Sequence, residues 1–191
     1  MQNDDRDIKI FNAKSPAEKS TEDELETMAD ILEKHRKNGN LAKAGKLGEE
    51  LALMSVGKVV SIPYGDDINV ESGDYTGIQY QASVLLVFSA RYFLGRYLGE
   101  ELIPTAMSAL YNKLIDISPS LFKDLSGGAE ISFYTLALSR DGEQMKHIGN
   151  CFAMLCKKDN DEKFSAYGAK LYGFVEKTLS KMIIDLDFKS I

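Results

Sequence analysis

IQYQASVLLVFSARYFLGRYL, residues 78–98, is the stretch that decides the fold of this chain. Between Ala82 and Leu94 apolar residues fall on nearly every face of a helix. A helix that is apolar all round must be surrounded by other helices. Polar residues interrupt the stretch too often for a membrane span, which takes roughly 20 apolar residues. We therefore expect 78–98 to be a buried central helix.

Helical periodicity continues on both sides of this stretch. Apolar and small residues recur every three or four positions over about 41–59 and about 163–184. Helix start and stop signals separate the segments: Gly39, Pro104, Ser118-Pro119, Gly127-Gly128 and Asp141-Gly142. The pattern predicts an all-α fold, an irregular multi-helix bundle or short helical array of about seven helices around 78–98.

Segment 130–139 is the one ambiguous element, because its apolar residues fit both a strand and a helix. We favour a helix, since a lone strand would leave its backbone groups unpaired. Residues 1–17 are polar and are expected to be a flexible arm. Residues 18–191 are expected to form a single all-helical domain, in which 61–77 is a long loop rich in glycine and acidic residues.

Composition excludes several classes of protein. The 23 basic and 29 acidic residues give a net charge of −6, which argues against nucleic-acid binding by bulk electrostatics. The first residues contain no basic region followed by an apolar run, so we see no signal peptide. Two cysteines, Cys151 and Cys156, suit a reducing compartment. We expect a cytoplasmic protein that contacts neither membrane nor nucleic acid.

The sequence holds no convergent set of catalytic or metal-binding residues. Glu143 and His147 are four residues apart, but a carboxylate-bridged metal site in a helical bundle needs two Glu-x-x-His pairs. His35 follows a lysine near a helix end, and we expect it to be solvated. We therefore predict no catalytic residues, no metal and no cofactor, and place an enzyme behind non-enzymatic functions.

Two arginines and a group of tyrosines are the features that point to binding. Arg91 lies in the apolar helix, where a guanidinium needs a carboxylate or an anionic ligand. The structural interpretation is an internal ion pair with Asp74, Glu100 or Glu101; the functional one is a pocket for a small anion. Tyrosines suit both wet pockets and protein interfaces. The candidate ligand-binding residues are Arg91, Arg96, Tyr75, Tyr80 and Tyr92.

The leading hypothesis is a cytosolic, non-enzymatic helical domain for protein interaction or an adaptor role. Its partner would be an unidentified protein or a second copy, since small residues at helical spacing, such as Ala44, Gly48 and Ala52, suit both close packing within one chain and a dimer face. The alternative is a helical domain that binds a small anionic or aromatic molecule near Arg91 and the tyrosines.

Overall fold

The computed structural model describes residues 16–58 and 75–190 of the 191 residues. These residues form eight α-helices and one π-helix, and no strand occurs among them. The prediction of an all-α fold is confirmed, with one α-helix more than expected. The elements are α1 (Pro16–Lys37), α2 (Asn40–Leu53), the π-helix η1 (Met54–Lys58), α3 (Tyr75–Tyr97), α4 (Ile103–Ile117), α5 (Pro119–Gly127), α6 (Ala129–Leu138), α7 (Gln144–Leu155) and α8 (Glu162–Leu186).

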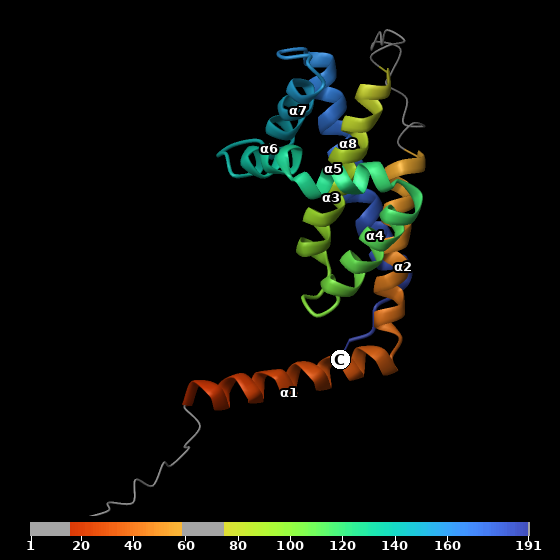
Figure 1. The fold of residues 1–191 in the computed structure, drawn as a ribbon, viewed down its shortest axis with the longest axis vertical. Helices are drawn as coiled ribbons and strands as arrows, with labels where there is room; N and C mark the ends of the chain where they lie inside the picture. Colours follow the sequence, from red (N-terminus) through yellow and green to blue (C-terminus); the bar gives the residue numbers. More distant parts are fainter. Residues whose placement is uncertain (1–15, 59–74, 191) are drawn as a thin grey trace, which may run out of the picture.

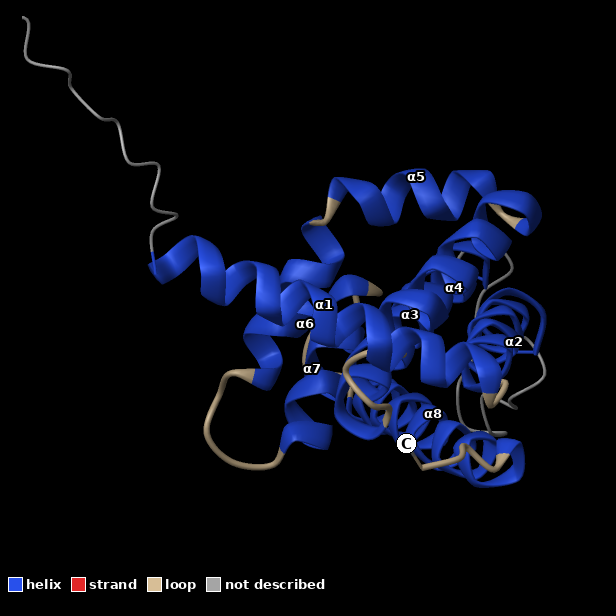
Figure 2. Ribbon diagram, turned by 90° about the horizontal axis from the view of Figure 1, so that it is seen from below, coloured by secondary structure: helices blue, strands red, loops and turns tan. Residues whose placement is uncertain are grey.

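Helix α3 occupies the centre of the fold, as predicted for residues 78–98. It packs against α8, α6, α4, α7 and η1, and both views show it between α2 on one side and α6 and α7 on the other (Figures 1 and 2). From Val84 to Ala90 every side chain is buried. Ser89, the one polar residue in that run, donates its hydroxyl to the Leu85 carbonyl at 2.7 Å, so no hydrogen bond is lost by its burial.

Glycines allow two pairs of helices to approach very closely. A Cβ added at Gly48 of α2 would lie 2.1 Å from the Ala106 carbonyl oxygen of α4. A Cβ at Gly149 of α7 would lie 2.2 Å from the Ser165 oxygen of α8. The absence of a side chain at Gly48 therefore serves packing within one chain. At Gly95 packing does not require glycine, because a Cβ there would meet nothing within 4 Å.

The helices begin and end close to the glycine and proline signals in the sequence. Gly39 ends α1 with φ of +82° and Gly128 ends α5 with φ of +75°, a conformation that glycine adopts without strain. Pro119 begins α5, and segment 130–139 lies almost entirely in α6, which confirms the preference for helix. Helix α1 begins at Pro16, two residues before the expected domain start. Residues 1–15 of the expected arm and 61–74 of the expected loop lie outside the described residues, while 75–77 form the start of α3.

The C-terminal segment returns to the turn between α1 and α2 (Figure 1). The Asn40 amide donates to the Lys189 carbonyl at 2.8 Å and accepts from the Lys189 N–H at 3.0 Å. These two bonds fix the orientation of the amide, so its second N–H donates to Nδ1 of His35 at 3.0 Å. His35 is only 6% exposed. The expectation of a solvated His35 is wrong, because it is buried against Asn40, which Lys189 from the far end of the chain holds in place.

No helix among the described residues is long and apolar enough to cross a bilayer. This agrees with the expectation that 78–98 is a core helix and not a membrane span.

Candidate functional site

The structure brings together only part of the predicted ligand-binding set. Arg91 and Arg96 are both exposed on α3. Arg91 forms no ion pair with any described carboxylate, Glu100 and Glu101 included, while Asp74 lies outside the described residues. The prediction of a buried Arg91 is wrong. Ala90, Phe93 and Leu94 around it are buried, but the face of α3 that carries Arg91 is left uncovered by α5 and α6.

Two adjoining pockets lie beside Arg91, and we call them together the Arg91 groove. The first has a volume of about 470 Å³ between α3, α4, α5 and α6, with Tyr111 and Phe122 on its wall. The second, of about 500 Å³, runs along α3 and α6 past Tyr92 and Leu138. Arg91 and Ile131 line both pockets. The guanidinium therefore lies at the middle of an otherwise largely apolar groove.

Tyr80 and Arg96 lie away from this groove. Tyr80 is eleven residues before Arg91, about 16 Å along the helix axis. Burial, followed by the charges of Glu130 and Asp124 and a hydrogen bond to Asp124, raises the pKa of Tyr80 to about 12. This phenol is a structural contact between α3 and the α5–α6 region. The side chain of Tyr75 is not described.

Arg96 belongs to a separate surface cluster with α8. The Tyr97 hydroxyl donates to Glu176 Oε1 at 2.6 Å, a bond that raises the pKa of Tyr97. A hydrogen bond to Tyr92 raises the pKa of Arg96. The bond from Tyr97 to Glu176 joins the end of α3 to α8. Of the predicted set, only Arg91 and Tyr92 line the Arg91 groove.

Helix α6 presents a feature that the sequence analysis did not identify. Its sequence, AEISFYTLAL, has no polar face, and such a helix normally lies in the interior. Here only Tyr134 and Ala137 are buried, while Phe133 is 47% and Leu136 is 56% exposed. The hydroxyls of Ser132 and Thr135 donate to the carbonyls of Gly128 and Ile131, so they are turned back onto the helix.

A groove between α6 and α7 adjoins these exposed side chains. We call it the α6–α7 groove; its volume is about 360 Å³. Its apolar wall holds Phe133, Leu136, Ala137 and Met154, and Met154 is itself 39% exposed. Arg140 and Asp159 also line it, and Arg140 forms no ion pair with a described carboxylate. The groove thus combines large exposed apolar side chains with one charge of each sign.

The same groove contains a cysteine and a histidine four residues apart on α7, which raises the question of nucleophilic chemistry. Burial raises the pKa of Cys151 to about 11, and the reactive species is the thiolate. His147 donates a hydrogen bond from Nε2 to the Asp141 carbonyl oxygen at 3.0 Å. A thiol with a raised pKa is a poor nucleophile at neutral pH, so the pair supports binding better than catalysis. Among the described residues no cluster of three or more potential metal ligands occurs.

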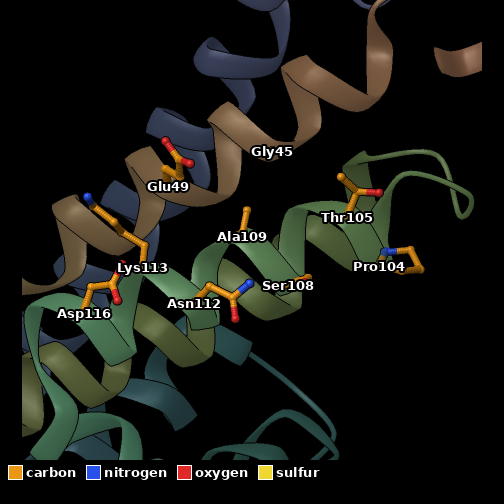
Figure 3. Close-up of a pocket in the computed structure, with 9 residues that line it drawn as sticks. All are labelled: Gly45, Glu49, Pro104, Thr105, Ser108, Ala109, Asn112, Lys113 and Asp116. Atoms are coloured by element: carbon orange, nitrogen blue, oxygen red, sulfur yellow. The ribbon is translucent and has the colours of Figure 1, made fainter.

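A further surface depression lies between α2 and α4 (Figure 3). It has a volume of about 590 Å³, and Lys113 and Asp116 of α4 stand near Glu49 of α2 at one end. Small and polar side chains make up the rest of its lining. This valley follows from the close approach of the two helices at Gly48, and its residues carry no unpaired buried group that would indicate a ligand.

Comparison with known proteins gives no relative for this chain: no protein-family model, no curated protein and no solved structure matches it.

Proposed function

We propose that this chain is a non-enzymatic protein-interaction domain whose partner docks on α6. The observation that carries the proposal is a helix without a polar face that lies at the surface with Phe133 and Leu136 about half exposed. Single exposed apolar residues are common on any protein, but contiguous ones beside a groove are typical of interaction sites. Here Phe133, Leu136 and Met154 line one groove from two helices.

The chemistry of the α6–α7 groove favours an amphipathic helix as its occupant. Helices that dock in grooves insert apolar anchors spaced three or four residues apart, and the groove offers apolar side chains from α6 and α7 at that scale. Arg140 and Asp159 give the lining one charge of each sign, so charge favours neither an acidic nor a basic partner. The proposed partner segment is therefore an amphipathic helix that binds by its apolar face.

Photo-crosslinking in the native cells tests the proposal. A benzoylphenylalanine in place of Phe133 should form a covalent adduct with a second polypeptide. The matched control places the same residue at Ile184 on α8, which is 75% exposed and lies outside the groove. Leu136→Glu in the Phe133-labelled chain should abolish the adduct, because it puts a charge in the apolar contact. Equal adducts at both positions, or none at Phe133, would refute the proposal.

A second candidate function has its own observation, the exposed Arg91 at the middle of a groove of two pockets. Each pocket has the size that small-molecule sites have, about 300–1,000 Å³. A small anionic ligand with an apolar or aromatic body would pair with Arg91 and cover Ile131. Native mass spectrometry of the purified chain should then find a bound molecule in the wild type and none in Arg91→Gln. An unliganded wild-type spectrum would set this candidate aside.

A further inference from the structure

We infer that the polypeptide which docks on α6 also enters the Arg91 groove, where the guanidinium binds the carboxylate of an aspartate or glutamate that has apolar neighbours in the partner's sequence. The inference rests on the proposed function and adds to it a charge preference that the α6–α7 groove does not supply. It comes from two observations. Helix α6 lines both grooves, and Arg91 is the one charged side chain among the described residues that line the second.

Helix α6 separates the α6–α7 groove from the Arg91 groove and lines both. Phe133 and Leu136 line the first, whereas Ile131, Thr135 and Leu138 line the second. No polar face of the helix lies between these two sets of side chains. A partner that covers the exposed apolar side chains of α6 therefore comes to the edge of both grooves.

The guanidinium of Arg91 is free to pair with a carboxylate from outside the chain. No described carboxylate forms an ion pair with it. Helix α3 contains no acidic residue, and α4, α5 and α6 contain one each, Asp116, Asp124 and Glu130. Asp116 lines the depression between α2 and α4. Asp124 forms a hydrogen bond with Tyr80 and Glu130 lies near the same phenol, about 16 Å from Arg91 along α3. Charge complementarity at this groove therefore selects an anion.

The hydroxyls of the Arg91 groove favour an acidic side chain of a polypeptide over a small polar molecule. The serines and the threonine of the lining each donate to a backbone carbonyl three or four residues earlier; they are Ser126, Ser132, Thr135 and Ser139. Small-molecule sites fix the orientation of their ligand with a few precisely placed polar groups, and these four hydroxyl protons are already used. An acidic residue between apolar residues needs one ion pair and apolar contacts on either side, and the groove provides both.

The two grooves are close enough for one segment to reach both. An α-helix with its side chains is about 10–12 Å across, and an extended chain covers about 3.3 Å per residue. A partner helix in the α6–α7 groove therefore needs roughly three or four further residues to cross α6. The acidic residue should lie at about that distance beyond one end of the docking helix in the partner's sequence.

Selection from a random peptide library displayed on phage tests this chemistry, with the full wild-type chain as bait. Peptides of about 16 residues are long enough for three turns of helix and the crossing residues. The selected peptides should share an aspartate or glutamate with apolar neighbours, next to an amphipathic stretch. Selected peptides without a shared acidic residue, or no selected peptide at all, would overturn the inference.

Fluorescence anisotropy of one selected peptide then measures the ion pair. Arg91→Gln should weaken binding by about 10-fold, and replacing the acidic residue of the peptide by its amide should weaken binding to the wild type equally. The two changes together should cost no more than either alone, because both remove the same pair. Lys123→Gln removes an exposed cation of α5 that lines neither groove and should leave the affinity unchanged. Additive losses, or full affinity in Arg91→Gln, would show that the carboxylate binds elsewhere.

Leu136→Glu distinguishes failure of this inference from failure of the proposed function. If Leu136→Glu abolishes peptide binding while Arg91→Gln leaves it unchanged, the docking role of α6 stands and the inference falls. If neither variant affects binding, both fall. Native mass spectrometry covers the remaining outcome. A small molecule that is bound to the wild type, absent from Arg91→Gln and not displaced by the peptide would assign the groove to a small anion and overturn the inference.

Discussion

Substitution of Gly48 by alanine probes the close packing that holds α2 on α4. The new Cβ would lie 2.1 Å from the Ala106 carbonyl oxygen and 2.9 Å from the Leu110 backbone nitrogen. The oxygen contact is about 1.3 Å shorter than an ordinary van der Waals separation of about 3.4 Å. Both opposing atoms belong to the backbone, so no side chain can rotate away and the helices themselves must separate.

The magnitude follows from two opposing terms. Alanine stabilises a helix interior by about 1 kcal/mol relative to glycine. Overpacking of a core costs about 1–3 kcal/mol, and a rigid backbone contact belongs at the upper end of that range. The net loss in the free energy of unfolding should be about 2 kcal/mol. For a chain of this length this lowers Tm by about 4–8 °C.

Gly45, one turn earlier in the same helix, is the matched control. A Cβ there would meet nothing within 4 Å, so only the helix term acts and Gly45→Ala should raise Tm by about 2–4 °C. Circular dichroism at 222 nm follows both variants, with thermal unfolding giving Tm and urea titration giving the free energy of unfolding. A Gly48→Ala chain as stable as Gly45→Ala would refute the close approach of α2 and α4.

Three further predictions concern residues that the fold places in particular surroundings. Asn40→Ala removes both bonds to Lys189 and the bond to His35. It should cost about 1–3 kcal/mol and speed carboxypeptidase trimming of the C-terminus, whereas Asn112→Ala, at an exposed position of α4, should do neither. Burial raises the pKa of Cys151 to about 11 and that of Cys156 to about 12. Because a raised pKa lowers the thiolate fraction, the native chain at pH 8 should react with a disulfide reagent about 100-fold slower than free cysteine. Rapid labelling of both thiols would contradict this. Arg91→Ala should change the unfolding free energy by less than about 0.5 kcal/mol, as for other exposed positions; a loss of several kcal/mol would mean that the guanidinium is paired after all.

The sequence predicts the core of this fold because the relevant signals are local. The all-round apolar character of 78–98 identifies α3 as the central helix, and Gly39, Pro119 and Gly128 mark helix ends through backbone preferences that need no tertiary information. The helical state of 130–139 could also be argued locally, from the need of a strand for a partner. These conclusions depend on a few neighbouring residues each.

The errors concern contacts that join distant parts of the chain. His35 was expected to be solvated because its neighbours are charged, yet it is covered by an asparagine that in turn pairs with Lys189, 149 residues further on. Arg91 was expected to be buried because the flanking residues are apolar. Whether one side of α3 is open at that residue depends on where α5 and α6 lie, and periodicity carries no information on this.

Helix α6 shows how one physical rule gives opposite results at two places in the same chain. Both α3 and α6 lack a polar face, so the sequence alone assigns both to the interior. Helix α3 obeys the rule because seven of the other described elements contact it. Helix α6 departs from the rule, with Phe133 and Leu136 exposed. Places where local preference and observed environment disagree are expected to be functional or strained. In the proposed function a partner covers these side chains and removes the cost of exposing them, so α6 is the element to perturb in testing that proposal.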